Sequence, residues 1–252
     1  MRAWGVTDVG LRRRENQDTY AFETFGAPDT VAAVVCDGMG GVNGGQIASE
    51  LAVSTFLEEL HTRAHVNMST EQVCAMECAC VQSANRAVYA RSLEEAAYHG
   101  MGTTLVSAIV SPDAAVVCNV GDSRAYHIGA GGITRITRDH SVVASLIEAG
   151  DITPEQARTH PNRNLITRAL GPEKAISCDC FTVPFAVGDS LLLCSDGLIV
   201  TVEDQEMLDI VRAVPDGEQA LAHLLALSKT RGAPDNVTAV LIRNEEVERQ
   251  DG

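Results

Sequence analysis

Short runs of apolar residues alternate along the chain with turns rich in glycine, proline and aspartate. Runs of this length predict β-strands. They cover residues 3–6, 19–24, 31–36, 105–110, 114–120, 124–128, 133–136, 190–194 and 237–242. Short turns at residues 26–29 and 111–113 join neighbouring strands into hairpins. Because consecutive hairpins form a meander, the strands are expected to be antiparallel.

The apolar positions adopt a helical spacing after residue 45. One helix face carries Ile47, Leu51, Ala52, Phe56, Leu57 and Leu60. A capping box at Ser69 and Gln72 begins a second helix, which extends to about residue 91. Further helices are predicted at residues 141–149, 202–214 and 218–230. Helices that are segregated from antiparallel strand pairs favour an α+β fold over a doubly wound sheet.

No linker, repeat or low-complexity tract divides the chain. Residues 1–243 are therefore predicted to form a single domain. The polar stretch at about 141–170 interrupts the strand pattern, and we expect it to form a flap over one sheet edge. Residues 244–252 are mostly charged and are predicted to be a C-terminal tail.

Aspartates stand at the ends of several predicted strands. Asp37, Asp122 and Asp196 follow apolar runs. Asp18 and Asp235 precede such runs. Because the end of one antiparallel strand lies beside the start of its neighbour, the five side chains are expected to meet at one rim of the fold. The first hairpin would place Asp18 next to Asp37.

Crowded carboxylates repel one another and raise one another's pKa, so five clustered aspartates need cations. A donor set made of oxygen atoms, without histidine, suits Mg²⁺ or Mn²⁺ better than Zn²⁺. Arg12, Arg13 and Arg14 lie shortly before Asp18. A guanidinium group binds two oxygens of a phosphate at once. The pattern therefore indicates a divalent metal site with a phosphate clamp beside it.

The charge of the chain restricts the classes of partner that it is expected to bind. The net charge is −15 and the isoelectric point is near 4.8, which argues against nucleic acids and anionic membranes. The sequence shows no charged and apolar leader and no apolar run of about 20 residues, the length that spans a bilayer. A cytoplasmic location is therefore expected.

The eight cysteines are expected to be reduced thiols. Those in apolar runs, such as Cys118 and Cys194, behave as small hydrophobic side chains. Cys74 and its neighbours occupy helical positions. Cys178 and Cys180 are too close in sequence for the usual zinc-binding pairs, and we expect them on a half-exposed strand.

Two other patterns favour different chemistry. Cys118 and Arg124 have the spacing of the thiolate phosphatases, but Cys118 lies in an apolar strand and Asp122 would place a negative charge in the phosphate cradle. His61 and His65 are one helical turn apart, as some metal-binding histidines are, but no third ligand lies near them in the sequence. They are expected to be surface residues.

Seven short motifs occur along nearly the whole chain. They are GLRRRENQD (10–18), CDGMGG (36–41), GTT (102–104), GDSR (121–124), DHS (139–141), SDGL (195–198) and DN (235–236). In this order they resemble the bacterial branch of the metal-dependent type 2C Ser/Thr protein phosphatases. The resemblance implies two antiparallel β-sheets packed face to face as a sandwich, with layers of helices outside.

The resemblance also assigns metal ligands. Asp37 would bridge two metal ions, and Gly38 would give its backbone carbonyl to one of them. Asp196 and Asp235 would complete the coordination of the other ion. Asp122, with help from Asp196, would hold a weaker third ion.

Further roles follow from the same resemblance. Arg13 would bind the substrate phosphate, and Asp18 would hold a metal-bound water. Asn236 would support Asp235 from behind, and Asn16 would likewise lie behind the metal ligands. Many relatives have Glu where this chain has Gln17. The absence of that carboxylate is expected to weaken the binding of the second metal ion. Met39 stands in place of the histidine of the mammalian branch, which leaves the general acid unassigned.

The implied activity is hydrolysis of phosphoserine and phosphothreonine in proteins by a metal-activated water, with Mn²⁺ or Mg²⁺ as cofactor. The expected partners are phosphorylated proteins and a Ser/Thr kinase whose action the enzyme reverses, and the chain is expected to be a monomer. The alternative is a catalytically weak relative that serves as a scaffold or regulatory binding module. Such members lose metal-binding aspartates, whereas this chain keeps all of them.

Overall fold

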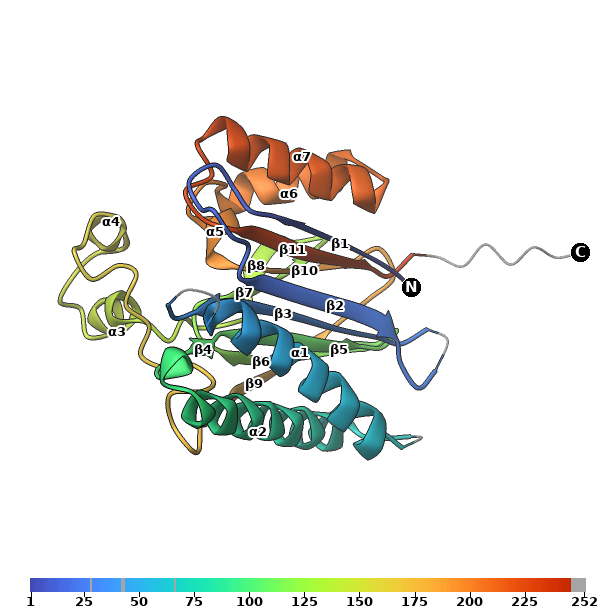
Figure 1. The fold of residues 1–252 in the computed structure, drawn as a ribbon. Coiled ribbons are helices and arrows are strands. Elements are labelled where there is room, and N and C mark those ends of the chain that lie inside the picture. The colour runs from blue at the N-terminus through green and yellow to red at the C-terminus, as the bar shows by residue number, and fades with distance from the viewer. Residues whose placement is uncertain (28, 42–43, 66, 246–252) are drawn as a thin grey trace, which may run out of the picture.

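Two antiparallel β-sheets pack face to face at the centre of the molecule (Figure 1). The computed structural model describes residues 1–27, 29–41, 44–65 and 67–245. The first sheet has five strands, in the order β1 (Arg2–Asp8), β11 (Val237–Arg243), β10 (Ser190–Cys194), β7 (Arg124–Gly129) and β8 (Gly132–Arg135). All neighbours in this sheet run antiparallel, as the hairpin pattern predicts.

The second sheet contains the first hairpin of the chain. Its strands lie in the order β2 (Asp18–Thr24), β3 (Val31–Met39), β5 (Leu105–Val110), β6 (Ala114–Val120) and β9 (Asp179–Pro184). The two-residue strand β4 (Gly102–Thr103) pairs with the end of β3. These pairings are also antiparallel.

Helices cover the outer face of each sheet (Figure 1). The six-stranded sheet is covered by α1 (Gly44–Arg63) and α2 (Thr70–Glu94), with the short helix η1 (Ala96–Tyr98) after them. The five-stranded sheet is covered by α5 (Asp196–Ile199), α6 (Asp204–Ala213) and α7 (Gly217–Thr230). The predicted α+β sandwich with helical outer layers is therefore confirmed. Within the described ranges, no helix combines the length and the apolar character that a membrane span requires.

Strand β3 is apolar without a break because both of its faces are covered. Its odd-numbered residues from Val31 to Val35 belong to the core between the sheets. Its even-numbered residues from Ala32 to Cys36 belong to the core under α1 and α2. Full burial of a valine side chain contributes about 1.5–3 kcal/mol. This packing fixes the register of the strand, and the register places Asp37 at the rim.

The stretch predicted as a flap, residues 141–170, lies beside the sandwich (Figure 1). It contains α3 (Val142–Glu148) and α4 (Pro154–Arg158). A β-bridge between Thr103 and Leu170 attaches its end to strand β4. Most of the predicted tail, residues 246–252, lies outside the described residues.

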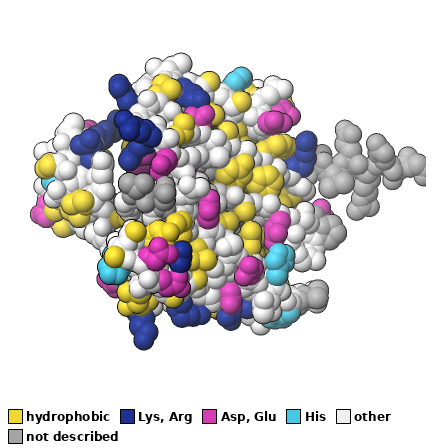
Figure 2. All heavy atoms as spheres, viewed as in Figure 1, with side chains coloured by type: hydrophobic (Ala, Val, Ile, Leu, Met, Phe, Trp, Pro, Cys, Tyr) yellow, Lys and Arg dark blue, Asp and Glu magenta, His cyan; other side chains and the backbone are white. Residues whose placement is uncertain are grey.

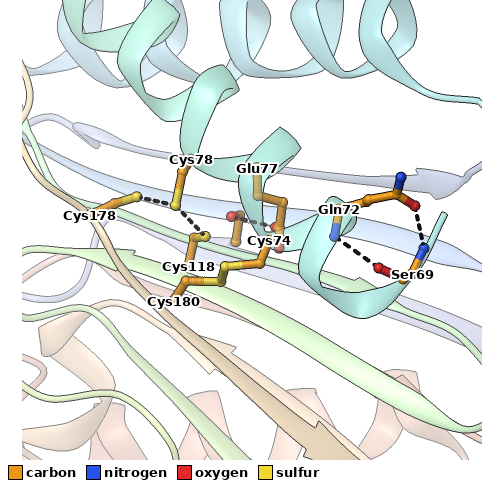
Figure 3. The surroundings of a disulfide bond; sticks show 9 residues. Ser69, Gln72, Cys74, Glu77, Cys78, Cys118, Cys178 and Cys180 are labelled. Atoms are coloured by element: carbon orange, nitrogen blue, oxygen red, sulfur yellow. Dashed lines mark hydrogen bonds between the residues drawn. A yellow bond between two sulfur atoms is a disulfide. The ribbon is translucent and has the colours of Figure 1, made fainter.

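The expectation that all cysteines are reduced is wrong for two of them. Cys74 of α2 and Cys180 of β9 form a disulfide bond (Figure 3). The two residues are 106 positions apart, and they meet because α2 packs across β9. Sequence spacing carries no sign of this contact. Cys180 does lie on a partly exposed strand, as predicted.

Candidate metal and phosphate site

One rim of the sandwich joins the two sheets through the start of β2. Asp18 is the first residue of β2 and lies opposite Asp37 of β3. Asp18 is buried, and its Oδ2 accepts a hydrogen bond of 2.7 Å from Ser195 Oγ. Ser195 follows β10 of the other sheet, and its Oγ also accepts from the Thr238 amide at 3.1 Å. The ends of strands from both sheets therefore meet here, as predicted.

The backbone of Asp37 is held by the segment that follows β4. Its amide donates to Thr104 Oγ1 at 2.9 Å. Its carbonyl accepts from Thr103 Oγ1 and from the Thr104 amide, both at 2.9 Å. Thr104 Oγ1 also lies within hydrogen-bond distance of Ser123 Oγ, at 2.7 Å. The turn that carries Asp122 is thus joined to the backbone of Asp37.

Gly38 occupies a point where β3 touches the start of α1. A Cβ atom at this position would lie 2.0 Å from the carbonyl oxygen of Gly45 and 2.6 Å from that of Gln17. The Gly38 amide donates to the same Gln17 carbonyl at 3.1 Å. Only backbone fits here, which is consistent with a ligand that acts through its carbonyl group.

Asp196 and Asp235 reach the rim from the five-stranded sheet. Asp196 is the first residue of α5, after β10, and Asp235 lies shortly before β11. Arg13, in the loop after β1, donates from Nη2 to Asp235 Oδ2 at 2.7 Å. Its side chain is 57% exposed, and Figure 2 shows Lys and Arg side chains gathered over this loop. The arginine predicted to bind phosphate therefore lies at the rim, paired with a predicted metal ligand.

Burial and mutual repulsion raise the pKa of the clustered carboxyl groups. Burial, the larger cause, and neighbouring carboxylates raise the pKa of Asp18 to about 6, of Asp122 to about 7 and of Asp196 to about 6. The pKa of Asp37 is raised well above its usual value by burial and then by the charges of the other four aspartates. The structure therefore brings all five predicted aspartates together, and the cluster favours a bound cation.

Two carboxylate oxygens at the rim are buried and have no hydrogen-bond partner among the described residues. They are Oδ1 of Asp18 and Oδ1 of Asp196. A buried carboxylate oxygen without a partner is destabilising unless a cation approaches it. Carboxylate and carbonyl oxygens are the ligands that hard divalent cations prefer. The residues at the rim therefore fit Mg²⁺ or Mn²⁺.

Two asparagines hold the loop that carries Arg13. Asn236 donates from Nδ2 to two backbone carbonyls of this loop, at 2.9 and 3.0 Å. Its Oδ1 accepts from the Gln17 amide at 2.9 Å. Asn16 Oδ1 accepts from the amide of Asp18 at 3.2 Å. Both residues thus contact the rim through backbone groups.

The sequence motifs assign no role to a chain of polar contacts that lies behind Asp122. The Gly121 amide donates to His140 Nδ1 at 3.0 Å. Because Nδ1 accepts, Nε2 carries the proton, and it lies 3.2 Å from Asp179 Oδ2. Asp179 also accepts from Arg168 Nη1 at 2.8 Å. Burial lowers the pKa of His140 and so favours this neutral form. The DHS motif is the only sequence signal for this network.

The two alternative sites are absent from the described structure. Cys118 is fully buried in β6, and its pKa is raised by a hydrogen bond with a neighbouring thiol and by burial. Arg124 is bound by both carboxylate oxygens of Asp139, at 2.9 and 2.6 Å. These two residues therefore do not form a phosphate cradle. His61 is exposed, and its Nε2 lies 2.8 Å from Glu23 Oε1.

Known proteins match this chain in sequence and structure. The family model described as Protein phosphatase 2C matches residues 12–241. Serine/threonine phosphatase stp of Listeria monocytogenes is 35% identical over 246 residues, which are 97% of this chain and 96% of that protein. The crystal structure of serine/threonine phosphatase Stp1 from Staphylococcus aureus is 36% identical, covers 97% of this chain and 95% of its own, and has a TM-score of 0.88.

A third match was solved with metal. It is the catalytic domain of the Ser/Thr protein phosphatase PstP in complex with two manganese ions, which is 31% identical, covers 95% of this chain and 96% of its own, and has a TM-score of 0.81. The family match includes every predicted site residue, from Arg13 to Asn236. The chain therefore belongs to the protein phosphatase 2C family.

Proposed function

We propose that this protein hydrolyses phosphoserine and phosphothreonine residues in other proteins with the help of two Mn²⁺ or Mg²⁺ ions. The observation that carries the proposal is the meeting of five aspartates from both sheets at one rim, where two buried carboxylate oxygens lack a partner among the described residues. The Ser/Thr phosphatases among the relatives and the manganese complex of PstP support it.

The proposed ligands follow the arrangement at the rim. Asp37, on which the charges of all the other aspartates act, would hold metal at the centre of the rim. The carbonyl of Gly38 and the carboxylates of Asp196 and Asp235 would supply the other protein ligands. Asp122 takes part in a third, weaker site with Asp196, whose charge is the second-largest cause of the raised pKa of Asp122.

The bound ions would supply a water of lowered pKa and stabilise negative charge on the phosphoryl oxygens. The protein supplies position and charge. Arg13 moves from Asp235 onto the substrate and binds two phosphate oxygens, and its exposure leaves it free to do so. Asp18 is held at Oδ2 by Ser195, so its Oδ1 accepts a hydrogen bond from the attacking water. The water attacks phosphorus in line, and no side chain forms a covalent bond with phosphate.

The alternative of an inactive scaffold is not favoured. A scaffold needs no clustered carboxylates, and their mutual repulsion destabilises the fold unless ions are bound. A Ser/Thr kinase as counterpart, a monomeric state and a cytoplasmic location stay predictions.

A phosphopeptide assay tests the proposed function. The purified protein is expected to release phosphate from phosphoserine and phosphothreonine peptides with Mn²⁺ and to lose this activity in EDTA. Asp37→Asn should strongly reduce activity, whereas Asp209→Asn, an exposed change on α6, should not. Activity that survives EDTA, or that disappears in Cys118→Ser but not in Asp37→Asn, would contradict the proposal.

A further inference from the structure

Five of the eight cysteines meet between helix α2 and the β6–β9 edge of the six-stranded sheet (Figure 3). Cys74 and Cys78 are four residues apart and share one face of α2. Cys118 of β6 lies directly opposite Cys180 of β9 in the sheet register. Cys178 stands two residues before Cys180, just ahead of β9. The fold therefore turns sulfur atoms from a helix and two strands toward one another.

Cys78 is the centre of this cysteine cluster. Its Sγ lies 3.8 Å from Cys118 Sγ and 2.7 Å from Cys178 Sγ (Figure 3). The Sγ atoms of these three residues all lie within 4.8 Å of one another. The Sγ atoms of Cys74, Cys78 and Cys180 also lie within 4.8 Å of one another. Four sulfur atoms thus surround that of Cys78 at close range.

The distances from Cys78 match a tetrahedral thiolate site, whereas Cys180, which is close to Cys78 and bonded to Cys74, must turn toward Cys118 and Cys178 once its disulfide is broken. Zinc binds thiolate sulfur at about 2.3 Å, so two ligands of one tetrahedron are about 3.8 Å apart. The Cys78–Cys118 separation already has this value. The Cys78–Cys178 pair must open by about 1 Å, and Cys178 has room to move because it is only partly buried and precedes β9.

The convergence of five sulfur atoms between α2 and the sheet edge favours a role beyond packing. Simple core packing needs no such convergence, because a buried thiol can sit alone, as Cys80 does two residues further along α2.

We propose that the cysteine cluster is a zinc site in which Cys78, Cys118, Cys178 and Cys180 bind one ion when the Cys74–Cys180 disulfide is reduced. Reduction of that disulfide by a dithiol takes up two electrons and two protons and leaves two thiols. Each of the four ligating thiols then gives up its proton to the solvent. The disulfide and the fourth zinc ligand exclude each other, because both need the sulfur of Cys180.

The site would join α2 to the edge strand β9. It differs from the acidic rim in its donors, since sulfur ligands select soft cations and oxygen ligands select hard ones. It also stands independently of the proposed phosphatase chemistry, because none of the five cysteines belongs to the rim.

The variant Cys74→Ser gives the sharpest test. It cannot form the disulfide, and it keeps all four proposed ligands. After exposure to zinc and dialysis, it is expected to hold about one more zinc ion per chain than Cys74→Ser/Cys178→Ser. With Co²⁺ in place of zinc, it should show the near-ultraviolet charge-transfer absorption that only thiolate ligands give. The acidic rim is identical in both variants and adds no such absorption.

Cys74→Ser/Cys80→Ala is the matched control, because Cys80 lies on the same helix outside the cluster. It should bind as Cys74→Ser does. Wild-type protein should bind the extra ion after reduction and lack it when oxidised. The proposal is wrong if Co²⁺ gives no thiolate absorption in Cys74→Ser. That result decides the question even if the double variant is unstable, which circular dichroism would reveal.

Discussion

The acidic rim and the cysteine cluster gather metal-binding side chains in different ways. The rim takes its aspartates from strand ends of both sheets, and its donors are oxygen atoms. The cluster takes its sulfur atoms from one helix face and two neighbouring strands of one sheet. Hard ions prefer the first set and soft ions the second. Each site should therefore lose its metal without loss of the other.

The largest expected effect is on catalytic activity, which should depend on the rim and not on the cysteine cluster. Asp37→Asn should lower kcat for a phosphopeptide by about 10²–10³-fold, the effect of removing one group that stabilises charge in a transition state. Cys178→Ser should change kcat by less than about twofold, because Cys178 lies away from the rim and a substitution at such a position has little effect on the reaction. Steady-state kinetics at saturating Mn²⁺ measure both. Equal losses of kcat in the two variants would show that the cysteine cluster also takes part in catalysis.

Manganese should stabilise the folded protein through the rim alone. At about 100 times its Kd, a ligand adds about 2.7 kcal/mol to stability. For a chain of this size that corresponds to a rise in Tm of about 5–10 °C. Differential scanning calorimetry should show this rise in the wild type and in Cys74→Ser/Cys178→Ser. Asp37→Asn should show little of it, and a full rise in Asp37→Asn would contradict the proposed ligands.

Arg13 should act on substrate binding rather than on metal binding. A hydrogen bond to a charged group is worth about 1.5–3 kcal/mol, so Arg13→Ala should lower kcat/KM by about 10–100-fold. Arg12→Ala is the control, because Arg12 is exposed in the same loop. Calorimetric titration should find Mn²⁺ affinity no weaker in Arg13→Ala, since the change frees Asp235. A weaker Mn²⁺ affinity would show that Arg13 instead supports the metal.

A further expected effect concerns Glu77, a buried carboxyl group on α2 beside the cysteine cluster (Figure 3). Its Oε1 accepts from Ser107 Oγ at 2.9 Å, and Oε2 has no partner among the described residues. Burial raises the pKa of Glu77 well above its usual value of 4.5.

The sign of its pH dependence follows. Below pH 4.5 the group is neutral in the folded and the unfolded chain. As pH rises through that value only the unfolded chain ionises, so the folded state loses about 1.4 kcal/mol per pH unit until the raised pKa is reached. Glu77→Gln removes this loss and should be more stable than wild type at pH 7. Urea unfolding between pH 4 and pH 7 measures it, and parallel curves for the two proteins would count against the expectation.

The sequence predicts that the aspartates meet at the rim because each of them is marked by a local pattern. Each aspartate stands at the end of an apolar run, and antiparallel pairing then brings strand ends together, as for Asp18 and Asp37. The motifs supply the roles. The main strands and helices follow from apolar spacing, whereas β4 is missed because two residues show no periodicity.

The contacts that the sequence does not reveal all depend on how the layers pack. The pairing of Arg13 with Asp235, the disulfide of Cys74 and the network through His140 join segments far apart in the chain. In each case the partner is chosen by the packing of one element on another. Apolar spacing predicts that an element has a buried face, but it does not say which residue of a distant element lies opposite.

The position of the rim has a consequence for how the enzyme matures. Arg13 and Asp235 are 222 positions apart, and Asp18 and Ser195 are 177 positions apart. A nascent chain that ends before Asp235 has Asp18 and Asp37 but lacks one of the proposed metal ligands, so we expect it to be inactive. Recovery of turnover after dilution from denaturant should therefore report the closure of the entire sandwich, later than any signal from the β2–β3 hairpin.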